Sequence, residues 1–127
     1  MLIELTTQKS LAEIDLALKE AAAKHKFGVL MVHNLQETMQ KKGVEFTKPV
    51  LVYEVCNPHQ AKKVLEANGA VSTALPCRIS VYSEGGLTKI ATLKPTELMR
   101  LFGNPELEPV AAEVEQVLVA MMQEAAG

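Results

Sequence analysis

The stretch Val50–Pro58, VLVYEVCNP, joins a dense apolar run to an abrupt helix signal. Six of its first seven residues are apolar or aromatic, which is typical of a strand buried on both faces. Asn57 is a preferred N-cap, and Pro58 suits the first helical position because its missing N–H would have no partner there. We therefore predict a central strand, a cap and a helix, with Cys56 at the junction.

The position of Cys56 is the strongest hint of chemistry in the chain. A thiol at a helix N-terminus lies near unpaired N–H groups and the positive end of the helix dipole. Both features stabilise the thiolate, so the sequence predicts a lowered pKa for Cys56. The position does not specify which chemistry such a thiol would perform.

Length and composition limit the class of protein. A chain of 127 residues is expected to form one domain, 1–127, around one core. A net charge of −2, 4% aromatic residues and no Trp argue against a nucleic-acid partner. No apolar run is long enough to predict a membrane span. The first residues do not resemble a signal peptide, so we expect a cytoplasmic protein with two free thiols rather than a disulfide.

Periodicity and capping signals divide the remainder into alternating strands and helices. The expected strands are 2–5, 27–32, 50–56, 78–82 and 87–93, and the expected helices are 10–26, 35–42, 58–68 and 97–102. Ser10 and Glu13 form a capping box, and Gly85-Gly86 supplies the turn of a β-hairpin. In the helix after Pro58, Ala61, Val64 and Leu65 are assigned to the inner face.

The last helix is expected to begin near Pro105 or Pro109, with a kink or a separate first turn at Pro109. Val110, Val114, Val117 and Met121 form an apolar stripe along it, widened by Ala111, Leu118 and Met122. Two interpretations stay open at this point. The stripe covers the sheet, or it packs against a second subunit.

Several motifs together resemble the family catalogued as domain of unknown function 302. They are Cys56-Asn57-Pro58, Leu75-Pro76-Cys77, the run 101–107 (LFGNPEL) and Phe27-Gly28-Val29. The resemblance implies an α+β fold similar to the TATA-box-binding-protein fold, with a curved, mostly antiparallel sheet of about five strands covered by helices. It also implies a homodimer, and it implies no activity.

The candidate site consists of Cys56, Asn57 and Pro58 at the helix cap, together with Cys77. A helix N-terminus suits an anionic ligand, and the thiols suit a thiol-containing one. Our leading hypothesis is therefore a homodimeric binding module for a small ligand. The alternatives are a redox or sulfur-transfer enzyme using Cys56, and a structural subunit that acts through its last helix. Two inert, buried thiols are the simplest interpretation of the cysteines.

No cofactor, metal or catalytic residue is predicted. Cys56 and His59 form one closely spaced pair that Cys77 or His33 would have to complete, whereas zinc sites need four ligands in a recognisable spacing. Whether the two thiols lie at the same end of the sheet depends on strand direction, which the sequence leaves open.

Glu54 lies inside the apolar strand and needs an explanation, since burying an unpaired charge is costly. We expect it to face solvent at a sheet edge. The alternatives are an ion pair with Arg78 or Lys62, or a buried carboxyl that acts as a general base.

Overall fold

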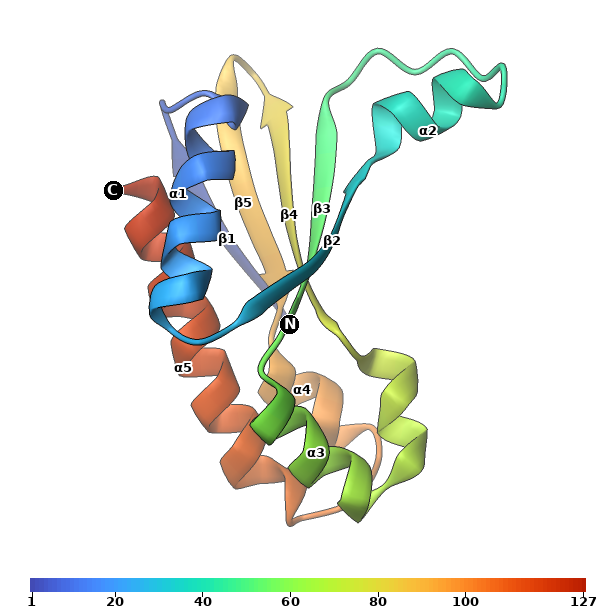
Figure 1. Cartoon of the computed structure of the whole chain (residues 1–127), viewed down its shortest axis with the longest axis vertical. Helices are drawn as coiled ribbons and strands as arrows, with labels where there is room; N and C mark the ends of the chain where they lie inside the picture. The colour runs from blue at the N-terminus through green and yellow to red at the C-terminus, as the bar shows by residue number, and fades with distance from the viewer.

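A five-stranded antiparallel sheet with helices on one face forms the body of the protein (Figure 1). The computed structural model describes residues 1–127. The strands are β1 (Leu2–Thr7), β2 (Gly28–Asn34), β3 (Val50–Cys56), β4 (Cys77–Glu84) and β5 (Leu87–Leu93), in the spatial order β1-β5-β4-β3-β2. The architecture is α+β with an antiparallel sheet, which confirms the predicted fold class.

Two helices, α1 (Leu11–Lys24) and α5 (Leu107–Ala126), cover one face of the sheet, and no helix lies on the other face (Figure 1). The predicted capping box of α1 is confirmed: the Ser10 hydroxyl accepts from the Glu13 N–H, and the Glu13 carboxylate accepts from the Ser10 N–H. No helix combines the length and the apolar character needed to cross a bilayer.

Strand β3 is second from the edge of the sheet and is buried on one face only. Tyr53 and Val55 point toward the helices and are fully buried, whereas Val52, Glu54 and Cys56 on the other face are half-buried. The prediction of a strand buried on both faces is wrong because helices cover a single face. The buried Tyr53 hydroxyl donates to Asp15 Oδ1 of α1 at 2.6 Å, which satisfies the one polar atom of that side chain.

The β4–β5 hairpin turns through Gly85 and Gly86, whose φ angles are +61° and +79°. Two consecutive positive φ values match a type I′ turn, which suits the twist of paired strands. The predicted hairpin is confirmed, and strand β4 begins one residue earlier than expected, at Cys77.

Helix α5 runs from Leu107 to Ala126 without interruption, so the predicted kink or separate first turn at Pro109 is not present. Pro109 falls in the first helical turn, where no N–H needs an intrahelical partner. Val114, Leu118 and Met121 of the predicted stripe are buried within this chain. The stripe therefore covers the sheet, which was the first of the two interpretations.

Buried residues form two clusters joined along α5. The main core has fifteen members from α1, Phe27, the sheet and the C-terminal part of α5. The smaller cluster has five: Val64, Val71, Met99, Leu107 and Ala111. It lies inside a helical lobe formed by α3 (Pro58–Ala67), the 3-10 helix η1 (Gly69–Ala74) and α4 (Pro95–Arg100), packed on the first part of α5 (Figure 1).

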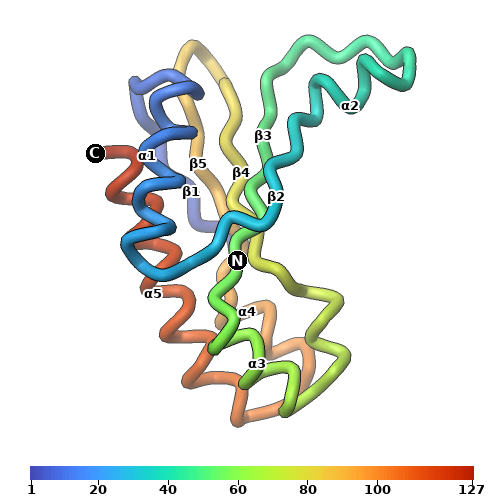
Figure 2. The backbone as a smooth tube through the Cα atoms, in the orientation of Figure 1, coloured from blue at the N-terminus to red at the C-terminus, as the bar shows by residue number.

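An arm projects from the opposite end of the sheet (Figure 2). It consists of α2 (Leu35–Lys41) and the loop 42–49 that returns to β3. Asn34 caps α2 by accepting from the Glu37 N–H, and Gly43 follows the helix with a φ of +75°. No residue of α2 is buried, so the packing that stabilises most helices is missing here.

A candidate ligand cavity between the sheet and the helical lobe

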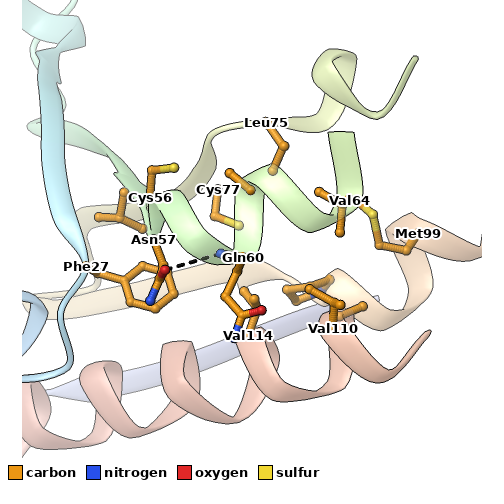
Figure 3. A pocket seen from close by; sticks show the side chains of 14 residues that line it. Phe27, Cys56, Asn57, Gln60, Val64, Leu75, Cys77, Met99, Val110 and Val114 are labelled. Carbon is orange, nitrogen blue, oxygen red and sulfur yellow. Dashed lines mark hydrogen bonds between the residues drawn. The ribbon is translucent and has the colours of Figure 1, made fainter. Parts of the chain in front are cut away.

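The two cysteines lie at the same end of the sheet. Strand β3 ends at Cys56, β4 begins at Cys77, and the strands are antiparallel neighbours. Val55 pairs with Cys77 in the register, so these two side chains share the helix-facing side of the sheet and Cys56 points to the other side. Figure 3 shows the Cys56 sulfur directed away from α5 and the Cys77 sulfur directed toward the interior.

Both thiols favour the neutral form. Burial raises the pKa of Cys56. Burial, with a smaller contribution from the neighbouring Cys56, raises the pKa of Cys77 to about 11. The lowered pKa predicted for Cys56 is therefore wrong in direction, because desolvation disfavours the thiolate.

The cap explains why the helix N-terminus does not offset this burial. The Asn57 side-chain oxygen accepts from the N–H groups of His59 and Gln60, at 3.0 and 3.3 Å. The predicted N-cap is confirmed, and Pro58 occupies the first turn of α3 as expected. The N–H groups that would have stabilised a thiolate are already hydrogen-bonded to Asn57.

A cavity of about 40 Å³ lies at the seam between the main core and the helical lobe. Its fourteen lining residues are mostly apolar and none carries a charge: Phe27, Val55, Cys56, Asn57, Gln60, Ala61, Val64, Leu75, Cys77, Pro95, Met99, Val110, Ala111 and Val114. Three of the four predicted site residues, Cys56, Asn57 and Cys77, contribute to this lining. Pro58 is exposed and does not.

Gln60 is the most informative residue of this cavity, and sequence reasoning missed it. Its Oε1 atom is buried and has no hydrogen-bond partner. Figure 3 shows its side chain extending from α3 toward α5, beside Val114. The available signal was spacing, because Gln60 lies four residues before Val64 and so shares its face of the helix. Leu65, which we assigned to that face, is 39% exposed.

Two segments of the lobe, α3 and η1, are attached by few buried side chains. Helices α3 and η1 bury one side chain each, Val64 and Val71. Between them, Asn68 donates from Nδ2 to Asn104 Oδ1 at 2.7 Å. The last helix was expected to begin near Pro105 or Pro109, and α5 begins between them, at Leu107. The Asn104 side chain, in the loop before α5, is the acceptor of this bond.

The other polar candidates lie outside the cavity. No group of three or more His, Cys, Asp or Glu side chains is placed to hold a metal ion. Glu54 is not at a sheet edge, contrary to our expectation. Its side chain is 17% exposed, and its Oε1 lies 3.4 Å from both Arg78 and His33. The ion pair with Arg78 was the second interpretation, and these partners explain how the strand tolerates the charge.

Comparisons with known proteins give a consistent result. The family model described as Domain of unknown function DUF302 matches residues 3–125. A crystal structure of an uncharacterized conserved protein DUF302 from Bacillus stearothermophilus superposes with a TM-score of 0.92. It is 35% identical, and the match covers 98% of this chain and 97% of that one. No curated protein matches the chain.

Proposed function

Since this chain belongs to the DUF302 family, whose description assigns no function, we propose a function from its geometry: the protein binds a small ligand in the cavity between the sheet and the helical lobe. Buried polar atoms in folded proteins nearly always have a hydrogen-bond partner. Gln60 Oε1 has none, and a bound molecule would supply it. This unpaired atom is the observation that carries the proposal.

The size of the cavity limits what fits inside. A cavity of about 150 Å³ holds benzene, whereas this one has about 40 Å³. It therefore accepts the head of a ligand, a few heavy atoms, with the rest extending past the half-buried rim at Cys56, Asn57, Ala61 and Leu75. Cys77 contributes a neutral thiol to the wall. The raised thiol pKa values favour binding over nucleophilic catalysis.

An NMR titration tests the proposal. We use three probes of matched length, 1-propanol, 1-propanethiol and propionate, and follow the methyl signals of Val64, Val110 and Met99. We expect saturable shifts with at least one probe. Ala61→Leu, which adds bulk at the cavity rim, should abolish them.

The matched control is Ala112→Leu, because Ala112 is exposed on α5 and does not line the cavity. This variant should bind like the wild type. If none of the three probes shifts the lining methyls, or if Ala61→Leu leaves the shifts unchanged, the cavity is not a ligand site.

We further propose that the protein is a homodimer formed through β2 and the arm. Strand β2 is an edge of the sheet, and edge strands with exposed apolar side chains favour pairing with another chain. Leu30 and Met31 on β2 and Val44 in the arm are all more than half exposed. A second copy would cover these side chains and give α2 a packing partner.

Sedimentation at micromolar concentration tests the dimer. The wild type should sediment as a dimer and Met31→Lys as a monomer, because a charge on an edge strand opposes pairing. Leu101→Lys is the control, since Leu101 is also exposed (76%, against 53% for Met31) but lies at the end of α4 in the helical lobe. A monomeric wild type contradicts this proposal and leaves the ligand site unaffected.

A further inference from the structure

We infer that the ligand presents a neutral hydrogen-bond donor, such as a hydroxyl group, to Gln60 Oε1, and that the site discriminates against anions. This inference rests on the proposed ligand site and names the class of molecule that it takes. Three features of the cavity support it: the absence of charge in its wall, the occupied N–H groups at the start of α3, and the unpaired amide oxygen.

The wall of the cavity contains no cationic side chain that could pair with a negatively charged group. None of the fourteen lining residues is charged. An anion that left water for this wall would lose its hydration without gaining a cationic partner, and that transfer is strongly unfavourable. A neutral polar group loses far less hydration free energy in the same transfer.

The helix N-terminus beside the cavity is already capped within the chain. A free N-terminus of this kind would suit an anion. Here the Asn57 side-chain oxygen occupies the N–H groups of His59 and Gln60. An anion could bind only by displacing Asn57, which would break both capping bonds.

The unpaired polar atom of the cavity wall, Gln60 Oε1, is a hydrogen-bond acceptor. Gln60 Oε1 is buried without a hydrogen-bond partner, and Gln60 lines the cavity. An acceptor requires a donor, and a hydroxyl group donates well whereas a thiol donates weakly. The remaining lining suits the carbon atoms next to that hydroxyl group.

The three probes used above rank the ligand classes. We expect 1-propanol to bind at least tenfold more tightly than propionate and more tightly than 1-propanethiol. Gln60→Leu removes the acceptor and keeps a side chain of similar length. It should weaken 1-propanol binding about fivefold, the usual value of one neutral hydrogen bond, and leave 1-propanethiol nearly unchanged.

Gln123→Leu provides the control, because it makes the same change at an exposed position of α5 outside the cavity. It should not alter the affinity of any probe. A backbone amide spectrum of each variant confirms that the fold is retained.

The outcomes separate this inference from the proposed function. If propionate or 1-propanethiol binds most tightly and Ala61→Leu blocks it, the cavity is a ligand site and the inference about its ligand is wrong. The same conclusion follows if 1-propanol binds equally to the wild type and to Gln60→Leu. If no probe binds, both proposals fail.

Discussion

The main core and the helical lobe are built differently, although both pack on the same helix. The main core encloses fifteen buried residues between the sheet, α1 and α5. The helical lobe encloses five, and its segments α3 and η1 contribute one each. Segments with few buried apolar contacts open locally at lower free energy than the core. The candidate cavity lies between the two regions. One of its walls belongs to the main core, and the other belongs to the lobe, which we expect to open more easily.

The residues that line the cavity come from both regions. Val55 and Val114 belong to the main core, whereas Val64 and Met99 belong to the lobe. Val110 packs against both clusters. A ligand bound here would contact both regions at once, and so it should stabilise the lobe on the core.

Truncating one buried side chain in each region should produce the largest change in the free energy of unfolding. Leu118 is fully buried in the main core and Val71 in the lobe. Leu118→Ala should lower the free energy of unfolding by about 3 kcal/mol. Val71→Ala should lower it by less, roughly 2 kcal/mol, because it removes two buried carbon groups instead of three. Urea denaturation measures both.

Hydrogen exchange then shows which segments each substitution destabilises. Val71→Ala should speed exchange of the α3 and η1 amides while the amides of β3 and β4 stay protected, because the lobe opens without unfolding the sheet. In Leu118→Ala, protection should fall in the sheet as well. Exchange that rises uniformly in both variants would show that the two regions unfold as one unit.

Cys77, which lines the cavity, makes a pH-dependent contribution to the free energy of unfolding. Its pKa is raised from 9.0 to about 11, so the folded protein holds a neutral thiol where the unfolded chain would ionise. A group with a raised pKa in the folded state contributes its full stability below the unfolded pKa. That contribution is lost as pH rises from about 9 through about 11, and it amounts to about 3 kcal/mol.

Stability curves of two variants isolate this effect. Between pH 7.5 and 10.5, Cys77→Ala should lose less stability than the wild type. Cys56→Ala should follow the wild type more closely, because the Cys56 shift is smaller. Every other titratable group is common to the wild type and to Cys77→Ala, so its contribution cancels in their comparison. Parallel curves for the wild type and Cys77→Ala would contradict the buried neutral thiol.

The sequence predicted local features better than burial, and particular residues show why. Ser10 and the pair Gly85-Gly86 act through their own backbone and near neighbours, so their local signals identified a cap and a turn. Burial of Val50–Cys56 depends on what covers each face of the sheet. That is a tertiary property, and the density of apolar residues could not reveal that one face is open.

The candidate site was predicted in part. Asn57 and Cys77 line the cavity because they stand at the ends of neighbouring antiparallel strands, a pairing that the sequence had left open. Gln60 was missed because a single glutamine on a helix carries no chemical signature, and only packing shows that its oxygen is unpaired. The pKa of Cys56 was misjudged because the dipole argument considered neither burial nor the Asn57 cap.

The smallest expected effect concerns the hydrogen bond between Asn68 and Asn104, which joins α3–η1 to the start of α5. Asn104→Ala removes it, and it should favour local opening of the lobe by about 1 kcal/mol, the usual net value of such a bond. Exchange of the α3 and η1 amides should then quicken about fivefold, with β3 unaffected.

Glu106→Ala is the matched control for Asn104→Ala. It removes the second side-chain partner of Asn104, at 3.4 Å, and leaves the bond to Asn68 in place. If exchange in α3 and η1 rises equally in both variants, the bond does not hold the lobe. If it rises only in Asn104→Ala, α4 keeps its own bonds to α5 through Thr96 and Arg100, and α3 and η1 are held by the bond between Asn68 and Asn104 and a few apolar contacts. A ligand head that reaches Gln60 then needs only those contacts to give way, while the sheet and α5 keep the opposite wall in place.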